Sequence, residues 1–400
     1  MGMRIIASTR CLAKPPTGIG HYTAETLRAL NRLPNVSVLE FPARWVQPLA
    51  RFRERHRDRW FEILDKPGPN LSAQRLRHSL VSRLERFFLR QHDKPDWFSP
   101  RCSDVYLETN HELVETDLPT VAVAYDLSVL RFPQWHPAQR VAHHRGFFES
   151  LLKPGRAMAV VTISEAVRGE LTSLLGIPAE KIITGCCAPR AHMRPGSRVK
   201  DLPALARLGL KPGYFLHVGT LEPRKNLAML VRAWAGLDRS IRDAHPLVFA
   251  GGKGWGDDAL QREIRQAPEG IHHLGYVDEA LIPALYRGAE CLVMPTHYEG
   301  YGMPVIEMRA AGGAVITSLD PAVREVAGPD TPGVDGLDQN GWREAMARAA
   351  DDPTWLDAQR TAGPGWAARH TWDRGARAVV EACQIALHGA LGDGQRVVAA

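Results

Sequence analysis

Residues 291–318, CLVMPTHYEGYGMPVIEMRAAGGAVITS, predict the unit around which the rest of the chain is arranged. An apolar run at 291–294 ends at a proline and is typical of a buried parallel strand. A polar loop follows, and Pro304 suits the first turn of a helix that we expect at about 305–311. Two glycines end this helix, and residues 314–317 predict the next strand. The stretch therefore indicates a strand–loop–helix–strand unit.

The loop of this unit combines two kinds of binding group. Gly300 and Gly302 lie beside the helix start, where free N–H groups and the positive end of the helix dipole favour an anion. Glu299 and Glu307 bracket the loop; a carboxylate repels phosphate but accepts hydrogen bonds from sugar hydroxyls. Donors for phosphate beside acceptors for hydroxyls predict a nucleotide-sugar site. The alternative is a helix-capping glutamate and a solvated one.

The segment EGYGMPVIEMRAAGGAV resembles the E-x7-E signature of glycosyltransferase family 4, the glycosyltransferase group 1 enzymes, which usually reads EGFGLPVLEAMACGTPV. These are retaining enzymes of the GT-B fold. The resemblance implies an α/β protein with two Rossmann-like domains, whose mostly parallel sheets face each other across a cleft. It also implies that Glu299 holds hydroxyls of the donor sugar and Glu307 those of the ribose. The donor-binding residues expected here are Gly300, Tyr301, Gly302, Met303, Pro304 and Glu307.

The composition is that of an ordinary globular protein, with 44% hydrophobic and 24% charged residues. No apolar run reaches the roughly 18 residues of a membrane-spanning helix, and the N-terminus lacks the apolar segment of a signal peptide. The six cysteines show no metal-ligand spacing, and scattered cysteines favour a reducing compartment. We therefore expect a cytoplasmic protein.

The positive charge is concentrated in residues 51–94, which contain 12 Lys and Arg against 6 Asp and Glu. Aromatic residues are interleaved with the cations. The segment predicts either a solvated helical face or a surface that lies on an anionic membrane. No nucleic-acid motif accompanies it, so we expect no nucleic-acid partner. The expected location is the cytoplasm, with possible peripheral contact with the inner face of the cytoplasmic membrane.

A glycine pair follows the first predicted strand, at residues 4–8. Gly18 and Gly20 precede a helix that we expect at 23–33. At this place a doubly wound domain brings its backbone close to a ligand, although a simple tight turn is the alternative. The resemblance implies a glycine loop that lies under the donor phosphates and faces the acceptor.

The strand predicted at 120–124 ends in Tyr125-Asp126-Leu127-Ser128, and FPQWHP follows at 132–137. These blocks resemble HDLS and FPEWHP in relatives, whose His is thought to sit over the donor sugar and phosphate. Tyr125 stands at that His position; its hydroxyl can donate to phosphate but cannot carry a positive charge. His111 is either a spatial substitute or a structural residue. We expect Asp126 to orient the loop or to bind the acceptor.

A second strand–helix series starts at 214–218, and its loop reads GTLEPRKN. Arg224 and Lys225 lie at a helix start, where two cations predict a diphosphate clamp. By resemblance, they neutralise the leaving diphosphate. The turn GGKGWG at 251–256 has the spacing of neither a dinucleotide-binding loop nor a P-loop, which excludes both classes. The further expected donor-binding residues are Gly219, Thr220, Gly252, Tyr276 and Val277.

No D-x-D triplet occurs in the chain, so we expect cations of the protein to do the work of a metal, with no metal and no cofactor. The resemblance implies a retaining hexosyltransferase that uses a nucleotide-diphosphate sugar and a glycan or lipid-linked acceptor. The relatives with HDLS and FPEWHP blocks are mannosyltransferases of bacterial polysaccharide and O-antigen assembly, so GDP-mannose is the first donor to test. The alternatives are a GT-B nucleotide-sugar epimerase and a non-catalytic member that binds donor or glycan.

The length of 400 residues suggests two domains. We expect an acceptor-binding Rossmann-like domain at 1–200 and a nucleotide-sugar-binding Rossmann-like domain at 201–372. By resemblance, residues 373–400 form a helix that crosses back to the N-terminal domain, followed by a tail.

Overall fold

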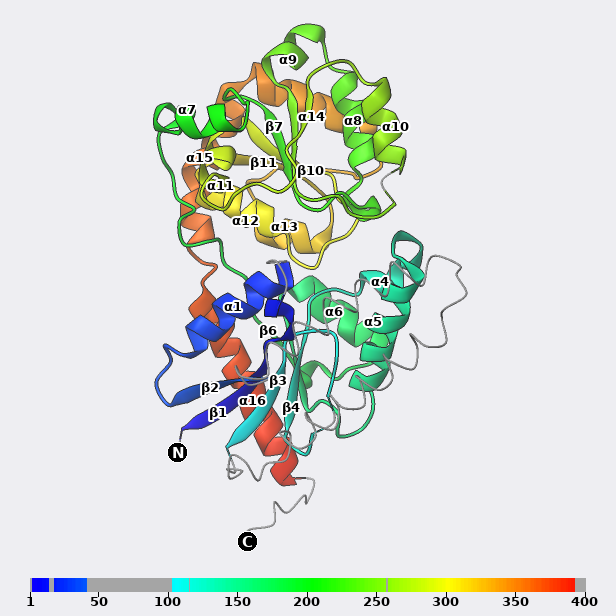
Figure 1. Cartoon of the computed structure of the whole chain (residues 1–400), viewed down its shortest axis with the longest axis vertical. Coiled ribbons are helices and arrows are strands. Elements are labelled where there is room, and N and C mark those ends of the chain that lie inside the picture. Colours follow the sequence, from blue (N-terminus) through cyan, green and yellow to red (C-terminus); the bar gives the residue numbers. More distant parts are fainter. Residues whose placement is uncertain (1, 14–17, 42–102, 115, 257, 393–400) are drawn as a thin grey trace, which may run out of the picture.

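The computed structural model describes residues 2–13, 18–41, 103–114, 116–256 and 258–392. These residues form two six-stranded sheets in which every neighbouring pair of strands is parallel (Figure 1). The α/β architecture with two parallel sheets is therefore confirmed. The basic segment 51–94 and the tail from 393 lie outside the described residues.

The first sheet has the order β2-β1-β3-β4-β5-β6 and forms the centre of what we call the N-terminal domain. Its strands are β1 (Met3–Ser8), β2 (Val36–Phe41), β3 (Asp104–Glu108), β4 (Thr120–Ala124), β5 (Ala159–Thr162) and β6 (Ile182–Thr184). Its helices are α1 (Gly18–Leu30), α4 (Ser128–Arg131), α5 (Ala138–Leu151) and α6 (Glu165–Leu175), with short 3-10 turns at η1 (Arg10–Ala13), η3 (Pro133–Trp135) and η4 (Ala179–Lys181).

The second sheet has the order β12-β11-β10-β7-β8-β9 and forms the centre of the C-terminal domain. Its strands are β7 (Phe215–Val218), β8 (Leu247–Ala250), β9 (Ile271–His273), β10 (Cys291–Met294), β11 (Ala314–Ser318) and β12 (Gly333–Val334). The helices are α7 (Arg198–Arg207), α8 (Leu227–Ala235), α9 (Arg239–Ala244), α10 (Asp258–Gln266), α11 (Ile282–Gly288), α12 (Met303–Ala310), α13 (Pro321–Ala327), α14 (Gln339–Asp351) and α15 (Pro353–Ala367), and η5 (Pro223–Lys225) precedes α8.

The central strands are buried along their whole length, which explains their continuous apolar sequences. All residues of β8, β10 and β11 are buried, since helices cover both faces of a parallel sheet. The strand predicted at 291–294 is confirmed with the same bounds, and α12 begins two residues before the predicted 305. Apolar runs bounded by glycine or proline therefore located these elements.

The predicted start and end of the first helix are wrong. Helix α1 begins at Gly18 and ends at Leu30, instead of occupying 23–33, so Gly18 and Gly20 lie in its first turns and not in a loop. Tyr22 and Thr23 are buried, which shows that packing begins before the predicted start. Helix α7 occupies part of the polar stretch 190–203, with Pro203 inside it, and packs against α11. The predicted domain boundary at residue 200 therefore falls within α7.

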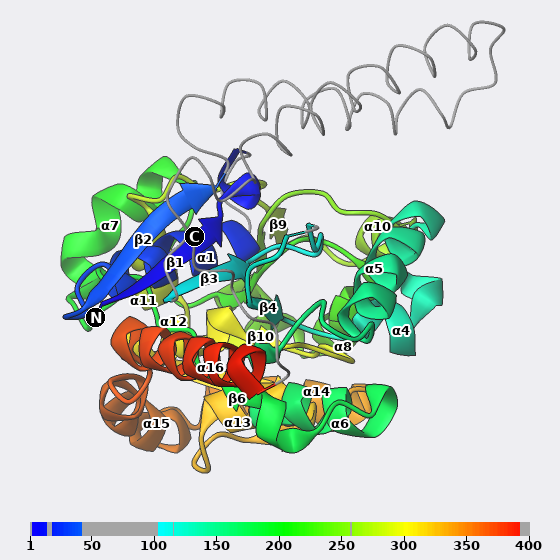
Figure 2. The same ribbon diagram turned by 90° about the horizontal axis from the view of Figure 1, so that it is seen from below.

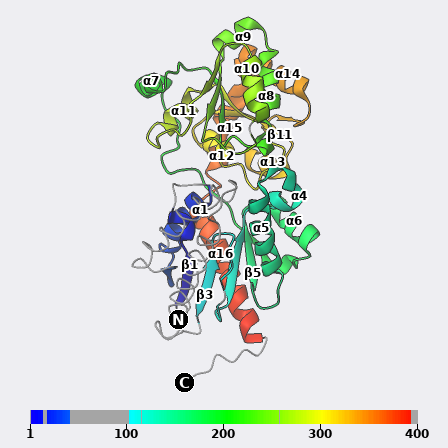
Figure 3. The same ribbon diagram turned by 45° about the vertical axis from the view of Figure 1, so that its right-hand side comes forward.

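The last helix, α16 (Trp372–Gly392), returns to the N-terminal domain. It packs against α1 and under β4, β5 and β6 (Figure 2), and Val379, Ala382 and Cys383 are fully buried there. Seen from the side, the two domains lie one above the other, and α6 meets α13 where they touch (Figure 3). None of the described helices is long and apolar enough to cross a membrane.

A buried ion pair holds α12 in the C-terminal domain. The Arg309 guanidinium is fully buried and donates to both carboxylate oxygens of Asp330, at 2.8 and 2.9 Å, and to the carbonyl of Gln359 at 3.2 Å. The Asp330 side chain keeps 30% of its surface exposed. Loss of Asp330 therefore leaves a fully buried cation, whereas loss of Arg309 leaves a carboxylate that solvent can reach.

We expect Asp330→Asn to lower the free energy of unfolding by about 3 to 5 kcal/mol, because it leaves a fully buried guanidinium without its counter-charge. Arg309→Met should cost about 1 to 3 kcal/mol, because water can reach the remaining Asp330. Urea denaturation followed by tryptophan fluorescence measures both, with exposed Arg207→Met as the control. A larger loss for Arg309→Met than for Asp330→Asn would contradict this account.

Candidate functional site

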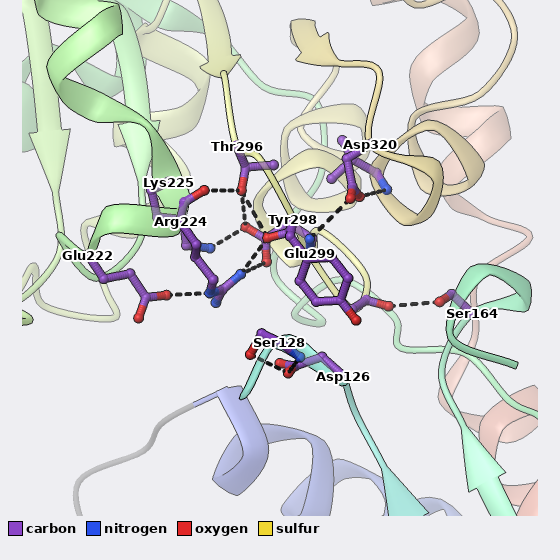
Figure 4. Close-up of polar contacts among 12 residues, drawn as sticks. Asp126, Ser128, Ser164, Glu222, Arg224, Lys225, Thr296, Tyr298, Glu299 and Asp320 are labelled. Atoms are coloured by element: carbon purple, nitrogen blue, oxygen red, sulfur yellow. Dashed lines mark hydrogen bonds and ion pairs between the residues drawn. The ribbon is translucent and has the colours of Figure 1, made fainter. Parts of the chain in front are cut away.

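Three loops meet at the carboxyl ends of parallel strands, the place where α/β sheets bind ligands. The loop after β10 carries Glu299, and the loop after β7 carries Arg224 and Lys225. The loop after β4 brings Asp126 from the N-terminal domain (Figure 4). Gly302, with φ of 107°, immediately precedes α12 in a backbone conformation that a residue with a Cβ rarely adopts. The sequence predicted these four charged residues as members of one site.

Glu299 lies between the two predicted cations. Its carboxylate accepts a hydrogen bond from Arg224 Nη1 at 2.6 Å, pairs with Lys225 Nζ, and accepts from Thr296 Oγ1 at 3.2 Å. Burial raises the pKa of Glu299, but Arg224 and Lys225 outweigh it and lower this pKa to about 2. Glu299 is therefore ionised at any physiological pH.

Arg224 is held by carboxylates on two sides. Its Nε lies 2.7 Å from Glu222, and its Nη1 also donates to the carbonyl of Tyr298 at 2.9 Å. Burial lowers the pKa of Arg224, but Glu299 and Glu222 outweigh it and raise the pKa. Cations at a helix start need an anion to offset the helix dipole, and here these carboxylates supply it.

Glu307 forms a second polar cluster, on α12. It accepts hydrogen bonds from Arg190 at 2.7 Å and from the Tyr286 hydroxyl at 2.8 Å, and it is only 3% exposed. Burial raises the pKa of Glu307, with Arg190 opposing the rise. Arg190 also pairs with Glu279 at 2.8 Å, in the loop that carries the predicted Tyr276. A ribose that reaches Glu307 must therefore displace or share Arg190.

Asp126 makes hydrogen bonds within its own loop. Its Oδ1 accepts hydrogen bonds from the Ser128 backbone N–H at 2.9 Å and the Ser128 hydroxyl at 2.7 Å. Burial raises the pKa of Asp126, but Arg224 of the C-terminal domain and the Ser128 bonds outweigh it and lower the pKa to about 2. An ionised carboxylate of the N-terminal domain therefore faces a cation of the C-terminal domain.

Tyr125 is turned into the N-terminal domain. Its hydroxyl donates to the carbonyl of Thr109 at 2.8 Å, and its ring packs edge-on against Tyr22 and His111. The predicted hydrogen bond from Tyr125 to phosphate would require this bond to break. His111 does lie beside Tyr125, but it is 5% exposed, and burial lowers its pKa to about 4, so its ring is neutral. In this arrangement neither residue supplies a positive charge.

Glycines allow the loops of the site to touch backbone to backbone. A Cβ on Gly300 would lie 2.0 Å from the carbonyl oxygen of Tyr125, in the other domain. A Cβ on Gly251 would lie equally close, 2.0 Å, to the carbonyl oxygen of Gly219. Gly219 and its neighbour Thr220 thus lie against the turn that contains Gly252. These contacts explain why the sequence needs glycine at positions 251 and 300.

The remaining predicted donor residues divide into backbone and side-chain candidates. Tyr301 is buried and its hydroxyl donates to the carbonyl of Cys187 at 2.7 Å, so only its backbone can face a donor. Met303 and Pro304 form the first turn of α12. Tyr276 is 69% exposed, whereas Val277 is buried. Tyr276 is therefore the one of these residues with a freely accessible side chain.

Sequence reasoning missed several residues that hold the site. Arg190 lies in a polar stretch without a motif, and its pairing with Glu307 arises only from tertiary structure. Asp320 caps α13 and accepts the Glu299 backbone N–H at 3.3 Å; burial raises its pKa to about 7. Asp-Pro before a helical pattern is an N-terminal signal that could have identified Asp320. Ser164 caps α6, since its hydroxyl accepts a hydrogen bond from the Val167 backbone N–H at 3.2 Å.

The described residues contain no group of three or more His, Cys, Asp or Glu side chains arranged to hold a metal ion. The polar groups of the site are instead an alternation of cations and carboxylates. Such an arrangement can bind a ligand that carries both phosphates and hydroxyls.

Comparisons with known proteins agree with this geometry. Residues 204–354 match the family model described as glycosyl transferases group 1. The O-antigen chain mannosyltransferase B of Escherichia coli is 29% identical over 383 residues, which cover 93% of this chain and 97% of that protein.

Solved structures show the same fold at low sequence identity. The structure of WaaG, a glycosyltransferase involved in lipopolysaccharide biosynthesis, superposes with a TM-score of 0.65 at 13% identity, over 96% of this chain and 99% of that one. HepE of Anabaena, in complex with UDP and glucose, also gives 0.65, at 15% identity over 98% and 100% of the two chains. The chain is therefore a glycosyltransferase of the GT-B fold with a glycosyl transferases group 1 domain.

Proposed function

We propose that the protein is a retaining mannosyltransferase that moves mannose from GDP-mannose to a glycan or lipid-linked acceptor in bacterial surface polysaccharide synthesis. The observation that carries the proposal is the buried cluster of Glu299, Arg224 and Lys225 at the carboxyl ends of β7 and β10. The similarity to an O-antigen mannosyltransferase over nearly the whole chain supports the choice of sugar and of acceptor class.

The donor would replace the internal ion pairs of the site. Without a donor, Glu299 pairs with both Arg224 and Lys225, and Glu222 also pairs with Arg224. A bound nucleotide sugar offers a diphosphate to the two cations and hydroxyls to the carboxylate, so each group would exchange its partner for a ligand atom. Glu307 would accept the ribose hydroxyls in the same way. This exchange leaves each buried charged group with a ligand partner, an anion for the cations and hydrogen-bond donors for the carboxylate.

The reaction needs stabilisation of the leaving diphosphate. As the bond between the sugar C1 and the phosphate oxygen breaks, negative charge grows on the diphosphate, and Arg224 and Lys225 would stabilise it most strongly in the transition state. We propose that these cations take the role of a metal ion. For retention, we propose front-face attack by the acceptor hydroxyl, whose proton passes to the departing phosphate.

Membrane contact is a separate part of the proposal, on residues 51–94. Their excess of cations would favour an anionic surface, where a lipid-linked acceptor lies. Reversal of four of these arginines to glutamate should abolish co-sedimentation with phosphatidylglycerol vesicles, whereas wild type should bind and should release at high salt. Unchanged binding of the reversed variant would refute membrane contact through this segment.

Donor recognition is tested by calorimetric titration with GDP, UDP, ADP and dTDP. We expect GDP to bind and Glu307→Ala to lower the affinity for GDP about 10- to 100-fold, because a carboxylate that accepts hydrogen bonds is lost. Glu344→Ala, on the exposed face of α14, is the matched control and should bind as wild type does. Equal affinity of Glu307→Ala and wild type for GDP would show that Glu307 does not contact the nucleotide. Tighter binding of another nucleoside diphosphate would show that the donor carries a different base.

Catalysis is tested by Lys225→Met, with GDP release from GDP-mannose measured in the presence of a mannose-terminated oligosaccharide. We expect kcat to fall about 10²- to 10³-fold, because a group that stabilises transition-state charge is lost. Lys211→Met, an exposed lysine of the same domain, should keep wild-type kcat. An α-mannoside product, identified by NMR, would support retention; a β-mannoside would refute it.

A further inference from the structure

The Tyr298 side chain crosses from the C-terminal domain into the N-terminal domain. Its hydroxyl accepts a hydrogen bond from the Leu127 backbone N–H at 2.9 Å and donates to Glu170 at 2.5 Å. Its ring lies edge-on to Phe132, with 5.6 Å between ring centroids. Only 4% of the surface of Tyr298 is exposed. Both hydrogen-bond partners of the Tyr298 hydroxyl thus belong to the N-terminal domain, whereas the backbone of Tyr298 belongs to the loop after β10.

This residue is directly connected to the charged cluster. Tyr298 precedes Glu299, and its carbonyl accepts hydrogen bonds from Arg224 at 2.9 Å and from Thr296 at 3.1 Å (Figure 4). A displacement of Tyr298 would therefore move the backbone of Glu299 and remove one of the bonds that orient Arg224.

The N-terminal domain also holds the other side of the same loop. The Ser164 hydroxyl donates to the Gly300 carbonyl at 2.8 Å (Figure 4), and the Gly300 backbone lies against the Tyr125 carbonyl. Residues 298–300 are thus fastened at two places to a domain that is not their own. These bonds can exist only when the two domains are together.

We propose that Tyr298 is a positioning residue, whose hydroxyl fixes the Glu299 loop in its reactive place when the domains close. The cations and carboxylates that would bind the donor lie in the C-terminal domain, apart from Arg190, so the fastening should serve turnover more than donor affinity. The reaction named here rests on the proposed function, whereas the fastening itself rests on the geometry alone.

Tyr298→Phe removes the hydroxyl and keeps the ring. We expect kcat with GDP-mannose to fall about 10-fold and KM for GDP-mannose to stay within about twofold, because roughly one charge-assisted hydrogen bond is lost. The control is Tyr214→Phe, since the Tyr214 hydroxyl donates at 2.6 Å to Leu285 inside the C-terminal domain and is equally buried. Tyr214→Phe should lower stability without changing kcat.

Hydrogen exchange tests the fastening without any ligand. In Tyr298→Phe the Leu127 N–H loses its acceptor, so its amide should exchange about 10-fold faster than in wild type and in Tyr214→Phe. Glu170→Gln changes the other partner of the hydroxyl, and the kcat losses of Glu170→Gln and Tyr298→Phe should be less than additive when combined. Glu170 also pairs with Arg131, so only the non-additive part reports on Tyr298.

The outcomes separate this inference from the proposed function. Unchanged Leu127 exchange in Tyr298→Phe, or an equal rise of KM and fall of kcat/KM with kcat constant, would overturn the positioning role. If wild type does not turn over GDP-mannose, the donor assignment fails, and the Leu127 exchange together with kcat for the sugar nucleotide that is turned over still decides the role of Tyr298.

Discussion

Compensation of buried charge is the constraint on which the site depends. Glu299 is ionised in a largely buried region, and its charge is tolerable there because Arg224 and Lys225 contact its carboxylate. Their loops come from two strands of one sheet, so the sheet must bring these strand ends together before the charges can be compensated. The fold therefore places the charged side chains. A ligand that displaces their ion pairs must offer an anion to the cations and hydrogen-bond donors to the carboxylate.

Contact between the domains extends this constraint to the N-terminal half. Asp126 interacts electrostatically with Arg224 of the other domain, and Glu325 on α13 accepts hydrogen bonds from the first backbone N–H groups of α6. A carboxylate from one domain thus stabilises the positive end of a helix in the other. Because polar groups of this kind re-hydrate easily, the two domains can separate without exposing one large apolar face at these points.

The sequence predicted the features that depend on local pattern. Buried parallel strands produce apolar runs, which located β10 at Cys291–Met294, and the E-x7-E resemblance identified Glu299 and Glu307. It did not predict the start of α1, because Gly18 and Gly20 favour a loop locally and only packing against the sheet makes them helical. Arg190 and Tyr298 were missed for a related reason: their partners Glu307 and Glu170 are more than 100 residues away, and no local spacing encodes such contacts.

The return of α16 to the N-terminal domain makes the chain topologically nested. Val379, Ala382 and Cys383 fill the core beneath β4, β5 and β6, although almost the whole C-terminal domain separates them in sequence from these strands. During synthesis, the C-terminal domain is complete before the N-terminal domain receives its last helix. The N-terminal domain is therefore synthesised first but completes its core last. A stop codon before residue 372 would damage this domain, although it lies at the opposite end of the sequence.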